Sequence, residues 1–151
     1  MEMQDEIELH KKGWVAQRIG WVLLALILIA ASLGFFGNGL VSKRYLSDEI
    51  ASVSYERFGR FETPIEMKVN ANIKNKLELK IPQAYLRKME LDKIVPQPEE
   101  QRIENDNMIF SFAANDLAQV TVYFLPQATG TISTSVDING RTFNISHFIY
   151  P

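Results

Sequence analysis

Residues 19–41 contain no Asp, Glu, Lys or Arg, and the centre of this run, residues 21–36, is apolar apart from one serine and one glycine. About 20 residues of α-helix cross the ~30 Å hydrocarbon layer of a bilayer. The run therefore predicts a transmembrane helix over residues 19–41. It divides the chain into an N-terminal cytoplasmic leader, residues 1–18, and a mixed polar and apolar part that begins at residue 42.

A cleaved signal peptide is the alternative interpretation of this run. Lys11, Lys12 and Arg18 would then form its charged region, and residues 30–32 would supply the small side chains of a cleavage site. The apolar run continues past that point through Phe35 and Phe36. An uncleaved signal-anchor therefore fits the sequence better.

Two tryptophans and a pair of small residues in and near the predicted span suggest contacts with the membrane interface and with another helix. Trp14 and Trp21 lie seven residues apart, on one face of a helix, and indole rings prefer the membrane–water interface. Ala30 and Gly34 form a small-xxx-small pair, which lets two helix backbones approach closely. We expect the tryptophans to be membrane-interface anchors and the small pair to be a candidate contact with another membrane helix.

The positive-inside rule gives an orientation. Lys11, Lys12 and Arg18 precede the span, whereas Lys43 and Arg44 follow it closely. Because cytoplasmic flanks carry the excess of Lys and Arg, this distribution favours a single-pass protein of a bacterial inner membrane with its C-terminal domain on the extracytoplasmic side.

Beyond a short tether, residues 42–50, apolar residues alternate with polar ones at a period of two. The pattern predicts half-buried strands, which we list by number: residues 53–58, 65–73, 77–81, 89–95, 102–104, 108–112, 118–125, 131–138 and 141–149. Asn139-Gly140 is a strong signal for a two-residue hairpin turn. No segment is suited to a long crossover helix. We therefore expect a mainly β fold over residues 51–151, an immunoglobulin-like antiparallel β-sandwich, with a small β-barrel as the alternative.

The composition excludes several classes of chemistry. The chain has no cysteine, and 16 basic residues balance 18 acidic ones, so neither a thiolate site nor a nucleic-acid footprint is expected. The two histidines, His10 and His147, lie on either side of the predicted span. We expect His147 to be a half-exposed strand residue. We expect no enzymatic activity, no cofactor and no metal site.

One segment, residues 55–61, combines aromatic rings with arginines. Tyr55, Arg57, Phe58, Arg60 and Phe61 are residue types that are enriched at the centres of protein interfaces. A first strand with its aromatics in the core and its arginines in water would give the same pattern. We list these five residues as candidate interface residues.

The order of these features resembles a group of uncharacterised small bacterial single-pass membrane proteins with a β-rich domain after the anchor. The residues that carry the resemblance are residues 18–21, the glycine-rich exit of the apolar run, and residues 55–58. The group implies an architecture and no activity. The order is also similar to that of membrane-anchored copper chaperones, which depend on cysteines that this chain lacks.

Together these features predict a non-enzymatic accessory protein. Its helix and sandwich would bind a neighbouring integral membrane protein or membrane complex, with the lipid bilayer as the other contact and no nucleic acid. A membrane-tethered module for a small ligand or a lipid is the alternative. The sequence leaves the identity of the partner and the oligomeric state open.

Overall fold

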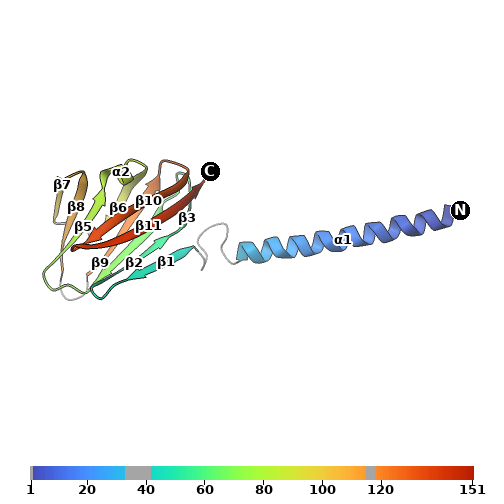
Figure 1. Cartoon of the computed structure of the whole chain (residues 1–151), viewed down its shortest axis with the longest axis horizontal. Coiled ribbons are helices and arrows are strands. Elements are labelled where there is room, and N and C mark those ends of the chain that lie inside the picture. The colour runs from blue at the N-terminus through green and yellow to red at the C-terminus, as the bar shows by residue number, and fades with distance from the viewer. Residues whose placement is uncertain (1, 33–41, 115–117) are drawn as a thin grey trace. The chain divides into compact units, whose positions relative to one another are not determined.

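The computed structural model describes residues 2–32, 42–114 and 118–151. The chain separates into two compact units, Met1–Val41 and Ser42–Pro151. Figure 1 labels the helices and most of the strands of both. We describe the helical unit and the β unit in turn.

The helical unit consists of α1, Glu2–Ser32. The guanidinium carbon of Arg18 lies 4.7 Å from the centre of the Trp14 ring, one helical turn away, which is a stabilising i,i+4 contact. Many large apolar side chains of α1 are between 47% and 64% exposed: Trp21, Val22, Leu23, Leu24, Leu26, Ile27, Leu28 and Ile29.

Among the described residues, no helix is both long enough and apolar enough to cross a membrane. The transmembrane helix predicted over residues 19–41 therefore finds no support in this part of the chain. Residues 33–41 of that range, Gly34 included, lie outside the described residues. The helix itself begins far earlier than residue 19 and includes most of the predicted leader.

Over its described residues, 42–114 and 118–151, the β unit contains eleven strands and one short helix. The strands are β1 (Lys43–Ser47), β2 (Ala51–Glu56), β3 (Phe58–Arg60), β4 (Ile65–Ala71), β5 (Lys76–Pro82), β6 (Met89–Val95), β7 (Glu100–Glu104), β8 (Asn107–Ala113), β9 (Ala118–Pro126), β10 (Gly130–Ile138) and β11 (Arg141–Tyr150). The helix, α2, is Gln83–Leu86, and Pro82 is its N-cap residue.

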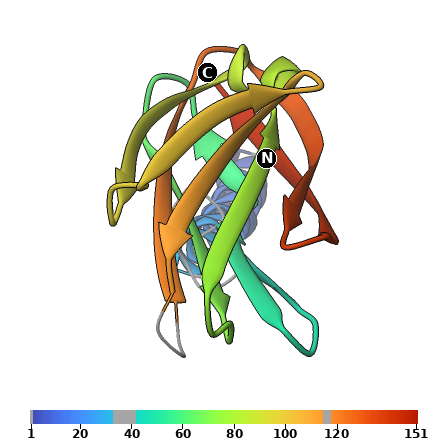
Figure 2. The same ribbon diagram turned by 90° about the vertical axis from the view of Figure 1, so that its left-hand side faces the viewer.

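The strands form two sheets, which Figure 2 shows as two layers. The first sheet has the order β1-β2-β4-β9-β6, and the second has the order β3-β11-β10-β5-β8-β7. All pairings are antiparallel except that of β3 with β11. The predicted mainly β, sandwich-like architecture is confirmed.

The core lies between the two sheets because each strand turns its apolar alternate residues inward. In β4 the buried residues are every second one, and the same holds in β9 and over residues 143–149 of β11. The largest fully buried side chains include Met67 from the first sheet with Leu79, Ile81 and Phe110 from the second. Burial of this apolar surface is the main force that holds the sheets together.

Two features of the sheets differ from the expectation. Residues 42–50, expected to be a tether, contain the edge strand β1. In addition, β2 and β3 are separated only by Arg57 but belong to different sheets, so the chain changes sheets at that residue. This change produces the parallel β3–β11 pair without a crossover helix, which the alternation pattern could not predict.

The Asn139-Gly140 turn is confirmed as the β10–β11 hairpin. Both residues have positive φ, 50° and 83°, as a type I′ turn requires. The side chain of Asn139 also extends the sheet: its Oδ1 accepts a hydrogen bond from the amide of Glu78 (2.7 Å), and its Nδ2 donates to the carbonyl of Lys76 (2.9 Å). The turn is therefore tied to β5 as well as to its own two strands.

Candidate interaction surface

The segment Tyr55–Phe61 divides between the core and the surface. Tyr55 is buried, and its ring packs edge-on against that of His147 at a centroid distance of 5.2 Å. Phe61 is partly buried against the core. Arg57 and Phe58 are half-buried and Arg60 is exposed. The structure thus brings three of these five candidate residues to the surface and places Tyr55 where no partner can reach it.

The pairing of β3 with β11 adds two aromatic residues to this surface. Phe58 lies opposite Phe148 in the parallel register, and Arg60 lies opposite Tyr150. Phe148 is 48% exposed although strands pair with it on both sides. We call Arg57, Phe58, Arg60, Phe148 and Tyr150 the aromatic–arginine surface.

Sequence reasoning missed Phe148 and Tyr150 because they lie about 90 residues from β3. One signal was present in the sequence: if Phe143, Ile145 and Ile149 face the core, the alternation places Phe148 on the outer face. An aromatic residue at an outward position is the mark that could have revealed it.

No acidic side chain within the described residues pairs with the arginines of this surface. Among the described residues, neither Arg57 nor Arg60 has a carboxylate within the 4.0 Å ion-pair distance. The guanidinium carbon of Arg57 instead lies 5.3 Å from the centre of the Phe58 ring. An aromatic ring beside an unpaired guanidinium suits contact with an acidic or aromatic surface.

The aromatic–arginine surface lies where the chain enters the β unit. The amide of Arg57 donates to the carbonyl of Ser42 (2.7 Å), and the hydroxyl of Ser42 donates to the carbonyl of Phe58 (3.4 Å). Ser42 is completely buried and is the first residue of this unit. Ser42 thus holds the start of β3 through these two hydrogen bonds.

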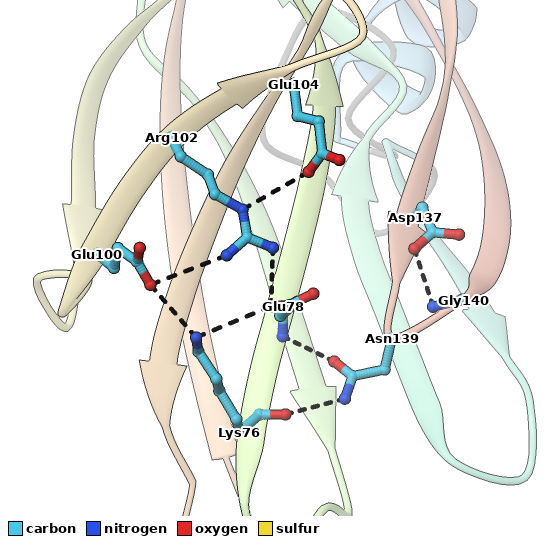
Figure 3. A network of polar contacts seen from close by, with 8 residues as sticks. All are labelled: Lys76, Glu78, Glu100, Arg102, Glu104, Asp137, Asn139 and Gly140. Atoms are coloured by element: carbon cyan, nitrogen blue, oxygen red, sulfur yellow. Dashed lines mark hydrogen bonds and ion pairs between the residues drawn. The ribbon is translucent and has the colours of Figure 1, made fainter.

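A second group of polar residues crosses the outer face of β5, β8 and β7 (Figure 3). Arg102 on β7 lies within 4 Å of three glutamates, Glu78, Glu100 and Glu104, and Lys76 lies 3.4 Å from Glu100. The Arg102–Glu78 pair spans β8, the strand between them. These charges are paired with one another, so the group is better suited to covering the sheet than to binding a ligand.

The charged side chains around Arg102 explain why two outward-facing residues of β8 are buried. Ile109 and Ser111 face outward, opposite to Phe110 and Phe112, yet only 3% and 1% of their surface is exposed. Ser111 lies in register between Glu78 and Glu100. The long charged side chains therefore bury both residues, and within the described residues the Ser111 hydroxyl has no hydrogen-bond partner.

His147 is a core residue, and the expectation that it is half-exposed is wrong. Only 1% of it is exposed. Its Nδ1 is hydrogen-bonded to the backbone carbonyl of Glu56, which can only accept, so Nδ1 carries the proton. Its Nε2 then accepts from the hydroxyl of Tyr85 at 2.9 Å. Both ring nitrogens are used, and burial lowers the pKa of His147 to about 4.

The grooves of the β unit include the following two. One, of about 650 Å³, lies between β6 and β7 and is lined by Leu91, Lys93, Val95, Pro98 and Gln101 among others. The other, of about 520 Å³, lies between the β1–β2 turn and the start of β11. In the parts of the chain that the structure describes, no group of three or more His, Asp or Glu side chains could hold a metal ion.

The candidate residues of α1 are only partly described. Trp14 and Trp21 are exposed, 60% and 64%, and Ala30 is half-buried. Gly34 lies outside the described residues. The predicted contact between Ala30, Gly34 and another helix therefore stays a prediction.

No protein-family model and no curated protein sequence matches this chain. Its function therefore depends on what the surfaces of the two units can bind.

Proposed function

We propose that this chain is a non-enzymatic, membrane-attached accessory protein that binds a neighbouring integral membrane protein or complex. The aromatic–arginine surface carries the proposal. In this account that surface contacts the partner's extramembrane part, and the apolar helix contacts lipid or a partner helix.

The apolar side chains of α1 support membrane attachment. Eight large apolar side chains between Trp21 and Ile29 are about half exposed in the isolated helix. Exposed apolar surface costs roughly 25 cal/mol per Å² relative to burial, so a continuous apolar run of this kind favours an apolar environment. The charge-free residues 33–41 continue the run in the sequence. An inner-membrane location with an extracytoplasmic β unit belongs to the same proposal and rests on the flanking lysines and arginines.

The composition of the aromatic–arginine surface supports a protein partner. Phenylalanine, tyrosine and arginine are enriched in interface cores, and a few such residues supply most of the binding free energy. Phe58 and Phe148 lie side by side in register, with Arg60 and Tyr150 as the next pair. The polar group around Arg102 is less suited to binding a partner, because its charges are already paired with one another.

The link between the two units restricts where the partner can be. Ten peptide steps join Ser32 to Ser42, and an extended chain covers about 3.5 Å per residue. A linker of this length reaches at most about 35 Å. A partner that contacts both units would have an extramembrane surface close to the bilayer.

A second candidate function is binding of a small ligand or lipid by the β unit, which we propose to be immunoglobulin-like. The groove of about 650 Å³ between β6 and β7 is the observation that favours it. Phe110, Phe112, Phe124 and Phe143, which could have lined a cavity between the sheets, are buried in the core. The groove also has a mixed polar and apolar lining, whereas most ligand sites are predominantly apolar.

The test is a pull-down of the full-length protein in mild detergent, followed by mass spectrometry. We expect a stoichiometric membrane protein to copurify, and to be lost when Phe148→Ala and Arg60→Glu are combined. Ile103→Ala is the matched control, because Ile103 is 64% exposed on β7, at the opposite edge of the same sheet. If the wild-type protein is recovered alone and monodisperse, the accessory function is wrong.

A further inference from the structure

The change of sheet at Arg57 leaves one strand edge incomplete. β11 has ten residues, but β3 pairs only with its last three, Phe148–Tyr150. Figure 1 shows β3 beside that end of β11. Within the described residues, no strand pairs with the outer edge of β11 over residues 141–147. The strand that would fill this place is β2, which lies in the other sheet.

The backbone groups on the open edge can be assigned by alternation. The amide of Phe148 donates to the carbonyl of Arg57 (2.6 Å), so the backbone of Phe148 points toward the β3 side. Successive residues of a strand point their N–H and C=O groups in opposite directions. The amides and carbonyls of Thr142, Asn144 and Ser146 therefore point to the open edge, whereas those of the intervening residues pair with β10.

The other sheet edges carry features that oppose pairing. β6 has an irregular register between Leu91 and Lys93, and Pro96 follows it directly. β7 carries Glu100, Arg102 and Glu104, and the five-residue β1 begins with a lysine and an arginine. Bulges, charges, prolines and short strands are the usual protections of an edge. The open part of β11 begins with one charged residue, Arg141, but beyond it carries no charge, proline or bulge, because its remaining outward residues are Thr142, Asn144 and Ser146.

A groove lies along this edge and provides room for a strand. It has a volume of about 520 Å³ and is lined by residues 46–48, at the end of β1 and the start of the β1–β2 turn, and by residues 140–144, from the β10–β11 turn into β11. Leu46 and Phe143 give it an apolar part. At one end, Arg141 Nε lies 3.4 Å from Asp48 Oδ2, so the charges there neutralise each other.

We propose that this edge binds an extended peptide segment of a partner protein, which adds a strand to β11. The peptide's backbone would pair with Thr142, Asn144 and Ser146, and one apolar side chain would enter the groove between Leu46 and Phe143. The peptide is uncharged at its centre, because the edge offers no charged side chain to pair with a charge there. It spans about six residues, since the open length is seven residues at about 3.3 Å each.

The probe is a phage-displayed library of random nine-residue peptides, selected on the full-length protein in detergent. We expect enriched peptides with alternating apolar residues. Synthetic versions should bind the wild type and Asn144→Ala equally. They should bind Asn144→Pro about tenfold more weakly, because proline removes the outward amide that would donate to the peptide. Asn144→Ala is the matched control for loss of the side chain.

Hydrogen exchange of the wild-type protein keeps the test independent of whether Asn144→Pro folds. We expect the amides of Thr142, Asn144 and Ser146 to exchange rapidly in the free protein and to become protected when the peptide is added. The amides of Phe143 and Ile145 should be protected in both states. If no peptide is enriched, or if the three outward amides gain no protection, the proposal is wrong. It does not depend on membrane attachment or on the aromatic–arginine surface, so either proposal can fail alone.

Discussion

The imidazole of His147 and the phenol of Tyr85 meet inside the β unit at 2.9 Å, although 62 residues separate them in the chain. Tyr85 comes from α2, in the connection between the two sheets, and His147 from β11. The second ring nitrogen of His147 binds the carbonyl of Glu56 at the end of β2. One neutral histidine therefore joins three elements of the sandwich.

We predict that acidification destabilises the β unit through His147. Burial holds the pKa of His147 at about 4, against 6.5 in an unfolded chain. Between these values the unfolded state binds the proton and the folded state does not, so stability is complete above about pH 6.5 and falls as the pH approaches 4. The loss amounts to about 3 kcal/mol at most. Urea unfolding of the full-length protein at a series of pH values measures it.

His147→Gln is the control for this pH dependence, because glutamine does not titrate. Burial raises the pKa of the neighbouring Glu56 carboxyl, which gives a slope of opposite sign at low pH. Glu56 is present in both proteins, so the difference between the two curves isolates His147. Equal slopes for wild type and His147→Gln between pH 6.5 and 4.5 would contradict the prediction.

We predict that Tyr85→Phe destabilises the β unit by about 1–2 kcal/mol. The change removes the donor to His147 Nε2 and leaves a buried acceptor without a partner. Tyr123→Phe is the matched control, because the Tyr123 hydroxyl is only partly buried and its bond to Glu66 is long, 3.4 Å. That variant should lie within about 0.5 kcal/mol of the wild type. Thermal or urea unfolding compares the two variants. Equal losses of unfolding free energy would show that the buried Tyr85–His147 hydrogen bond stabilises the unit no more than the partly buried Tyr123–Glu66 bond.

We predict that Gly59→Ala is destabilising for lack of space. A Cβ at residue 59 would lie 2.8 Å from Cγ2 of Ile65 and 3.0 Å from Cδ1 of Ile149. Crowding of this kind in a packed core costs about 1–3 kcal/mol. Adding Ile149→Val removes one of the two close atoms, so the double variant should lose less than the sum of its parts. If the losses of the two single variants are additive in urea unfolding, the Cβ of residue 59 does not press on Ile149, and the crowding is relieved by movement of the backbone.

The sequence predicted most of the fold because alternation is a local property. Residues 65–71 and 118–125 alternate in apolar character, and the structure contains β4 and β9 there. The Asn139-Gly140 turn was predicted for the same reason. The change of sheet at Arg57 was not, because residues 53–58 contain no Gly, Pro, Asn or Asp that would divide one strand, and only the pairing with residues about 90 positions away assigns Phe58 to the second sheet. The sequence therefore predicted only part of the candidate surface. The residues in and next to β3 were recognised from their composition. Phe148 and Tyr150 on β11 were not, because only the tertiary pairing brings them beside β3.

We predict that Asn139→Gly destabilises the β unit by about 1–2 kcal/mol although glycine suits the turn. The positive φ of residue 139 is retained, so the change removes only the two side-chain hydrogen bonds to β5. Asn105→Gly is the matched control. Asn105 also has a positive φ, 49°, but within the described residues its side chain bonds to no other strand. Relief of left-handed strain should make that variant neutral or slightly more stable. Equal unfolding midpoints for the two variants would show that the Asn139 side chain does not stabilise the β10–β5 junction.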